Sequence, residues 1–91
     1  MNLDTNKPFQ LSSTYRLQWE DAQDKFVLLY PEGLVELNQS SAEILQLCNN
    51  TNHLADITLL LEKKFETSGL GNDIRDFLNT ALDNGWITQN A

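Results

Sequence analysis

Cysteine and histidine are scarce in this chain, and the shortage excludes several classes of site. Its 91 residues contain one cysteine and one histidine. Cys48 cannot form a disulfide within the chain, which agrees with a reducing compartment. The single histidine, His53, is expected to lie far from Cys48, so the two residues do not form a metal-ligand set of the usual spacing. No apolar run is long enough to span a bilayer, so we expect no metal, no cofactor and no membrane segment.

Positive charge is also scarce. Six Lys and Arg residues stand against thirteen Asp and Glu residues, for a formal net charge of -7. A field of that sign repels both a nucleic-acid backbone and an anionic membrane, so neither is expected as a partner. The N-terminal residues "MNLDTNKPFQLSST" lack the basic start and apolar run of a signal peptide. We therefore expect a cytoplasmic protein.

Catalytic groups are missing from the sequence pattern. Cys48 lies on the apolar stripe of an expected helix, with no basic residue near it in sequence to activate the thiol. The carboxylates of "WEDAQD" belong to a polar turn that offers no apolar enclosure to raise a pKa. His53 is expected at the surface, at the start of a helix. The sequence predicts no catalytic residue and no enzyme activity.

What the chain does contain is enough apolar residues for one small core. Hydrophobic residues make up 41 % of the sequence, as in globular proteins. A chain this short supports a single domain. Residues 1–14, polar and interrupted by Pro8, are expected to form a flexible N-terminal arm, and residues 15–88 the domain.

Three strands are expected at the start of that domain. "YRLQWE" alternates apolar and polar residues, as a half-buried strand does. "KFVLLY" is apolar throughout, as expected of a central strand. A third strand, residues 34–37, follows the turn "YPEG". Because consecutive strands usually pair as neighbours, the third strand is left with a free edge.

The turn predicts a register for the second and third strands. If Gly33 forms a left-handed bulge after a type I turn, Tyr30 faces Leu34. In that register Val35 and Leu37 point their main-chain groups out of the free edge. The face expected to line the core then consists of Val27, Leu29, Val35 and Leu37.

Three helices are expected after the strands. Ser40 and Glu43 have the spacing of a capping box, which starts the first helix. The second helix is expected over about residues 54–65, and the third begins at about Asp73 and stops at Asn84-Gly85. The following "WI" can fold back to close the core.

Four stretches, "RLQWE", "LLYPEGLVELN", "SAEIL" and "DIRDFLNTALDNGWI", closely resemble the PqqD family of peptide chaperones in pyrroloquinoline quinone biosynthesis. The resemblance covers about residues 8–88. It implies an α+β fold, a small winged helix-turn-helix-like domain with a three-stranded antiparallel sheet followed by three helices. It also implies that the domain binds a ribosomally made precursor peptide and presents it to a radical S-adenosylmethionine enzyme, which joins a glutamate to a tyrosine of the peptide. The domain itself then catalyses nothing.

The same resemblance implies a binding site. In related peptide-recognition domains the leader lies as an added strand on the third strand, in a cleft walled by the third helix. Main-chain hydrogen bonds then supply affinity, and the cleft selects side chains. Carried onto this chain, the expected peptide-binding residues are Leu34, Val35, Glu36, Leu37, Arg75, Leu78 and Leu82.

Other interpretations remain. A winged-helix DNA-binding regulator shares the order of elements, but its third helix would set Arg75 against Asp73, Asp76 and Asp83. A non-catalytic scaffold subunit of the enzyme is a further alternative. The third strand could also be an edge that pairs with nothing, protected by Glu36. The oligomeric state is open, since the exposed edges of the first and third strands could both support a dimer.

Overall fold

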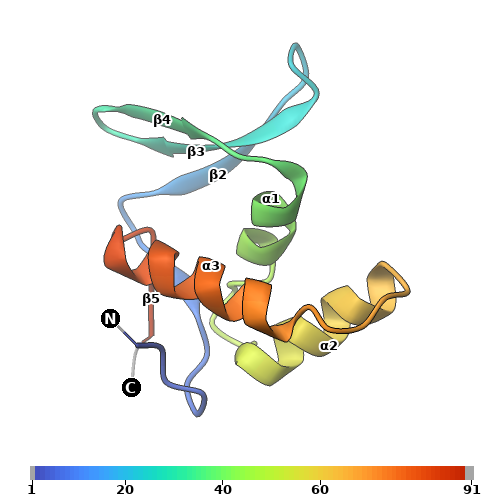
Figure 1. Cartoon of the computed structure of the whole chain (residues 1–91). Helices are drawn as coiled ribbons and strands as arrows, with labels where there is room; N and C mark the ends of the chain where they lie inside the picture. Colours follow the sequence, from blue (N-terminus) through green and yellow to red (C-terminus); the bar gives the residue numbers. More distant parts are fainter. Residues whose placement is uncertain (1, 90–91) are drawn as a thin grey trace.

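Two antiparallel sheets and three helices form the fold (Figure 1). The computed structural model describes residues 2–89. The smaller sheet pairs β1 (Gln10–Leu11) with β5 (Ile87–Thr88). The larger sheet consists, in spatial order, of β2 (Arg16–Glu20), β3 (Lys25–Tyr30) and β4 (Gly33–Glu36). The predicted three-stranded antiparallel sheet with a central second strand is confirmed.

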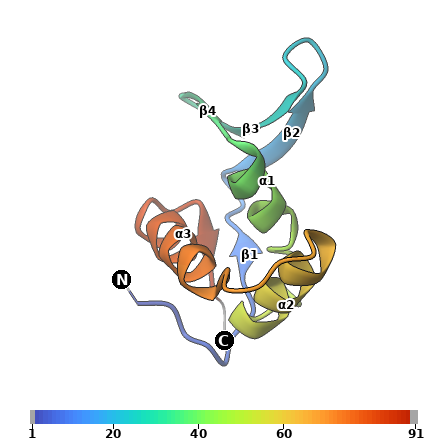
Figure 2. The same cartoon turned by 45° about the vertical axis from the view of Figure 1, so that its right-hand side comes forward.

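The helices are α1 (Gln39–Gln46), α2 (Leu54–Lys64) and α3 (Gly71–Asp83). α1 contacts β3, and α2 packs against α3. Figure 2 shows the larger sheet at one end of the molecule and α2 and α3 at the other, with the β3–β4 hairpin as the wing. The predicted α+β class, a winged helix-turn-helix-like domain with a sheet followed by three helices, is confirmed.

The predicted register of the wing is wrong by one residue. Tyr30 pairs with Gly33 and Leu28 with Val35, so a two-residue turn joins the strands and no bulge is present. A one-residue slip moves every side chain to the other face of a strand. Val27 therefore lies on the face opposite Val35, and the fully buried Leu28 takes the core side. The physical cause is burial: the observed register sets Val35 on the core side with the fully buried Leu28, whereas the predicted register would pair Val35 with Leu29 on the other face.

The predicted cap of the first helix is also wrong. Asn38 is the N-cap of α1, and its Oδ1 accepts a hydrogen bond of 2.8 Å from the N–H of Ser41. Ser40 lies inside the first turn. Glu43 accepts hydrogen bonds from Lys64 Nζ at 2.8 and 3.0 Å instead of closing a capping box. Asn38, Ser40 and Ser41 are all common N-cap residue types, so the sequence alone left more than one possible start for the helix.

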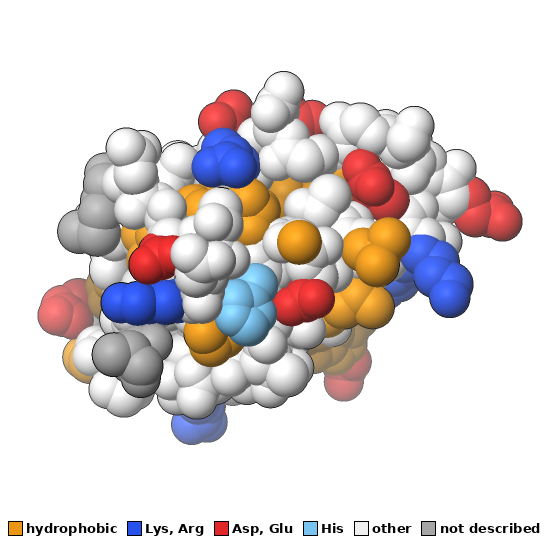
Figure 3. Space-filling model, turned by 90° about the horizontal axis from the view of Figure 1, so that it is seen from below, with side chains coloured by type: hydrophobic (Ala, Val, Ile, Leu, Met, Phe, Trp, Pro, Cys, Tyr) orange, Lys and Arg blue, Asp and Glu red, His pale blue; other side chains and the backbone are white. Residues whose placement is uncertain are grey.

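His53 starts α2 at the surface, as expected. It is the N-cap residue, and its backbone N–H donates to Asp56 Oδ2 at 2.9 Å. This hydrogen bond is the main reason that the pKa of Asp56 is lowered. Figure 3 shows the imidazole, pale blue, exposed beside acidic, basic and hydrophobic side chains.

Cys48 is buried, as expected, but it lies beyond the end of α1. Its Sγ donates to the carbonyl oxygen of Ile44 at 3.5 Å. Burial raises the pKa of the thiol to about 12, so almost none is thiolate at neutral pH. The thiol therefore belongs to the core.

Part of the segment expected to be an arm, residues 1–14, contributes to the core. Phe9 is fully buried, Leu3 is buried against α3, and β1 pairs with β5. The Gln89 amide bridges to the same segment, donating to Asp4 O at 2.6 Å and accepting from Asp4 N at 2.8 Å. The packed core thus begins earlier in the chain than residue 15.

Candidate functional site

The outer edge of β4 has no neighbouring strand among the described residues. The Leu37 N–H donates to the carbonyl oxygen of Phe26 in β3. Inward- and outward-directed residues alternate along an antiparallel strand, so Val35 also directs its main-chain groups to β3. Leu34 and Glu36 then direct their N–H and C=O groups out of the edge. The predicted outward pair, Val35 and Leu37, is wrong because the register was wrong.

The side chains of β4 differ in exposure. Leu34 is 50 % exposed, whereas Val35 faces the core and Leu37 is buried. Glu36 is exposed and accepts a hydrogen bond of 2.8 Å from Lys25 Nζ. That hydrogen bond, assisted by the charge of the ammonium group, lowers the pKa of the Glu36 carboxyl. An added strand would meet an edge that is apolar at Leu34 and charge-neutralised at Glu36.

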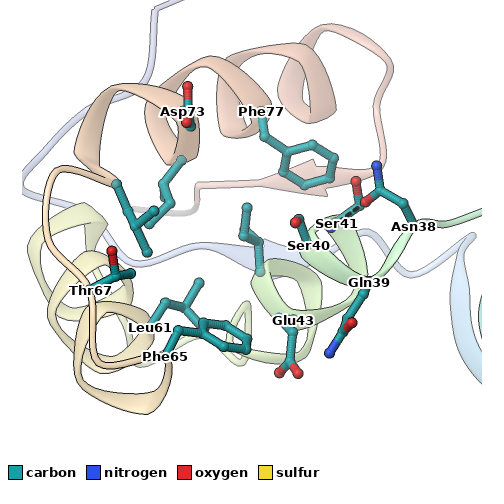
Figure 4. Close-up of a pocket in the computed structure, with 13 residues that line it drawn as sticks. Asn38, Gln39, Ser40, Ser41, Glu43, Leu61, Phe65, Thr67, Asp73 and Phe77 are labelled. Atoms are coloured by element: carbon teal, nitrogen blue, oxygen red, sulfur yellow. Dashed lines mark hydrogen bonds between the residues drawn. The ribbon is translucent and has the colours of Figure 1, made fainter.

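A groove lies beyond the end of β4, between the first turn of α1, the end of α2 and α3 (Figure 4). Its volume is about 530 Å³. The buried side chains of Ile44, Leu61 and Ile74 form its apolar floor. Phe77 of α3 and Phe65 at the end of α2 stand at different ends of it. The groove can accept a large apolar side chain.

The rim of the groove is polar but holds no catalytic set. Its side chains are hydroxyls, amides and carboxylates, from Asn38, Gln39, Ser40, Ser41, Glu43, Thr67 and Asp73. Within residues 2–89, no group of three or more His, Cys, Asp or Glu side chains could hold a metal ion. In the same part of the chain no helix is long and apolar enough to cross a membrane. The groove thus combines an apolar floor with a polar rim.

The expected contributions of α3 lie elsewhere. Leu78 is fully buried, so its placement on an exposed flank is wrong. Arg75 lines a hollow with Thr5 and Leu59, and Leu82 lines another beside β5. Neither hollow is the groove beside β4. Leu34 to Leu37 are consecutive along β4 and just beyond it, whereas Arg75 and Leu82 line other hollows and Leu78 lies in the core.

The sequence did not indicate which residues in and just before α3 line the groove. Leu70, Asp73, Ile74 and Phe77 follow one another at helical spacing along a single face. That spacing was present in the sequence as an i, i+3, i+4, i+7 pattern. It could not be told from the neighbouring core stripe, because the two stripes overlap and the apolar residues Ile74 and Phe77 fit either one.

Comparisons with known proteins give the family of the chain. The family model "Coenzyme PQQ synthesis protein D (PqqD)" matches residues 25–87. The chain belongs to the PqqD family. A PqqA binding protein of Methylococcus capsulatus is 45 % identical over 89 residues, which cover 98 % of this chain and 96 % of the relative. The PqqA binding protein of Kluyvera intermedia is 42 % identical over 74 residues, or 80 % of each chain.

Solved structures of two PqqD proteins are similar to this chain. The solution structure of the PqqD truncation of Methylobacterium extorquens PqqCD, described as a RiPP recognition element, has a TM-score of 0.78 at 20 % identity. That likeness covers 94 % of each chain and supports the fold. The crystal structure of PqqD from Xanthomonas campestris has a TM-score of 0.54 at 27 % identity, covering 91 % of this chain and 94 % of that one.

Proposed function

We propose that this PqqD-family chain binds the precursor peptide of pyrroloquinoline quinone and presents it, in the cytoplasm, to the radical S-adenosylmethionine enzyme of the pathway. The observation that carries the proposal is an open strand edge followed directly by an apolar groove, in a family whose relatives are named PqqA binding proteins. The chain acts as a chaperone and supplies no catalytic group.

Strand addition explains how one site can hold an extended peptide. The N–H and C=O groups of Leu34 and Glu36 supply hydrogen bonds that do not depend on the peptide sequence. The groove beyond them receives an apolar side chain and provides selectivity. Of the residues that the resemblance implied, Leu34, Val35, Glu36 and Leu37 remain in the proposed site; Phe65 and Phe77 are added from the groove.

The alternatives receive less support. A DNA-binding regulator would need a basic third helix, whereas α3 carries Asp73, Asp76 and Asp83 against one arginine. A scaffold subunit would not need an open edge beside a groove. Binding of the isolated peptide, without the enzyme, separates a chaperone from a scaffold.

Amide hydrogen exchange with and without the isolated precursor peptide tests the proposal. Exchange at Leu34 and Glu36 should slow when the peptide is added, whereas Val35 is protected beforehand by its bond to β3. Leu34→Pro should weaken binding far more than Leu34→Ala, because proline removes an outward N–H and alanine removes only packing. Unchanged exchange along β4 at saturating peptide would refute strand addition.

A further inference from the structure

The hollow that Arg75 lines together with Leu59, the α2 hollow, has a volume of about 570 Å³. Leu54, Ala55 and Leu59 give it apolar walls on α2. Leu59 is 67 % exposed, more than any other large hydrophobic residue of the described chain. Figure 3 views the molecule from below, the side on which α2 lies, and shows hydrophobic side chains near the pale blue imidazole of His53. The free chain thus leaves apolar surface of α2 open to water.

A cation beside this apolar surface has no partner. Arg75 of α3 is exposed, and no salt bridge joins it to a carboxylate of residues 2–89. Glu62 lines the same hollow, but its carboxylate is used within the fold, where Oε2 accepts a hydrogen bond of 3.0 Å from the N–H of Leu70. In a chain with a net charge of -7, the α2 hollow therefore offers a guanidinium that is free to bind an anion.

These two features fit a protein segment that carries a large apolar side chain next to a carboxylate. The apolar side chain fills the hollow against Leu59, and the carboxylate accepts two parallel hydrogen bonds from the planar guanidinium of Arg75. Exclusion of water by the apolar side chain strengthens the ion pair, since charges attract more strongly at low dielectric constant. A nucleic acid or an anionic membrane is repelled by the net charge of the chain.

The α2 hollow is separate from the proposed peptide site. The groove beside β4 and the α2 hollow have no lining residue in common, although both include residues of α2 and α3. On α2, Leu61 lies in the groove and Leu59 in the hollow; on α3, Asp73 and Arg75 divide in the same way. A peptide on β4 therefore leaves the α2 hollow free, and the chain can hold the peptide and a second protein together.

We propose that the α2 hollow docks the enzyme to which the peptide is presented. The enzyme inserts an apolar side chain beside Leu59 and pairs an adjacent carboxylate with Arg75. This inference rests on the proposed function, because presentation of a bound peptide requires a second contact surface that leaves the peptide site uncovered. It also gives a role to Arg75, which the resemblance had implied for peptide binding.

Isothermal titration calorimetry of the chain with the purified enzyme, in the absence of peptide, tests the surface. Leu59→Ser should weaken binding about 5- to 30-fold, because the enzyme covers a leucine that is exposed in the free chain. Arg75→Glu should weaken binding about tenfold or more, because two carboxylates then meet. Arg75→Lys keeps the charge but loses the planar fork, so its loss should be smaller. Circular dichroism verifies that the variants are folded.

Leu60→Ser is the matched control. Leu60 lies on the same helix and is 45 % exposed, but it does not line the α2 hollow. Its substitution should change the affinity for the enzyme less than about twofold. A larger loss in Leu60→Ser than in Leu59→Ser would place the contact on another face of α2 and overturn the proposal.

Two further results would overturn it: no binding of the enzyme to the wild-type chain, or wild-type affinity for the enzyme in both folded Leu59→Ser and folded Arg75→Glu. Titration with the precursor peptide alone keeps this inference distinct from the proposed function. Both variants should bind the peptide as the wild type does. A loss of peptide affinity in Arg75→Glu would return Arg75 to the peptide site and also overturn the docking surface. Failure of the wild-type chain to bind peptide refutes the proposed function, on which the choice of partner depends.

Discussion

Phe77→Ala separates the groove observed beside β4 from the flank of α3 that the sequence had suggested. Phe77 is half-buried: one part of its ring packs near Trp86, 6.3 Å away between centroids, and another part faces the groove. Full burial of a phenylalanine side chain contributes about 1.5–3 kcal/mol. A peptide covers only the part that is open in the free protein, so we expect a loss of roughly 1–2 kcal/mol, or about 5- to 30-fold in dissociation constant.

The matched control is Leu82→Ala. Leu82 lies on the same helix and is also half-buried, but it lines the hollow beside β5 and not the groove. Its truncation should lower thermal stability while changing peptide affinity less than about twofold. Phe77→Ala also loses its contact with Trp86, worth about 0.5–1.5 kcal/mol of folding free energy, so both variants are compared at equal folded fractions.

Isothermal titration calorimetry with the isolated precursor peptide measures the effect, and circular dichroism gives the folded fraction. Wild-type affinity in Phe77→Ala together with a tenfold loss in Leu82→Ala would refute the assignment of the groove. It would also restore the cleft that the resemblance had implied, on the other flank of α3.

The remaining predictions concern stability, reactivity and salt. Asn38→Ala should lower the free energy of unfolding by about 1 kcal/mol in urea denaturation, whereas Ser40→Ala should change it little, since only Asn38 caps α1; equal losses would contradict this cap. Glu66, which follows α2, has a φ of 51°, so Glu66→Gly should raise the free energy of unfolding by about 0.5–1 kcal/mol. Gly85, which follows α3, has a φ of 76°, so Gly85→Ala should lower the free energy of unfolding by about 1 kcal/mol. Cys48 should react with a thiol reagent at neutral pH only after denaturation, because its pKa is raised to about 12. Peptide affinity should fall less than about threefold between low and moderate salt, because the groove floor is apolar; a tenfold fall would show that charge dominates.

Local patterns in the sequence were sufficient to predict most elements. The alternation of "YRLQWE" and the apolar run "KFVLLY" correspond to β2 and β3, and the expected second helix matches α2 at its start. The third helix begins at Gly71, two residues before the predicted start. It ends at Asp83, just before Asn84-Gly85, as predicted. These features depend on neighbouring residues, and so they are visible in a single sequence.

The candidate site was predicted only in part, because much of it depends on contacts between residues that are distant in the sequence. The free edge of β4 follows from the order of the strands, but the residues that point outward depend on the turn. Both a bulged and a two-residue turn fit "YPEG", and the choice between them depends on Val35 reaching the core face of the sheet beside Leu28. The groove needs Phe65, at the end of α2, and Phe77 of α3, which line one hollow only when the two helices pack together.

The sequence by itself determined the single domain, the strand and helix order and the family resemblance, since periodicity and short motifs carry these directly. The tertiary structure alone decided the register of the wing, the cap of α1, the packing of Phe9 against the helices and the position of the groove. Each of these depends on contacts between residues far apart in the chain or on competition between nearly equivalent local choices. Burial resolves that competition, because only one arrangement fills the core while leaving no buried side-chain polar atom of the described residues without a partner.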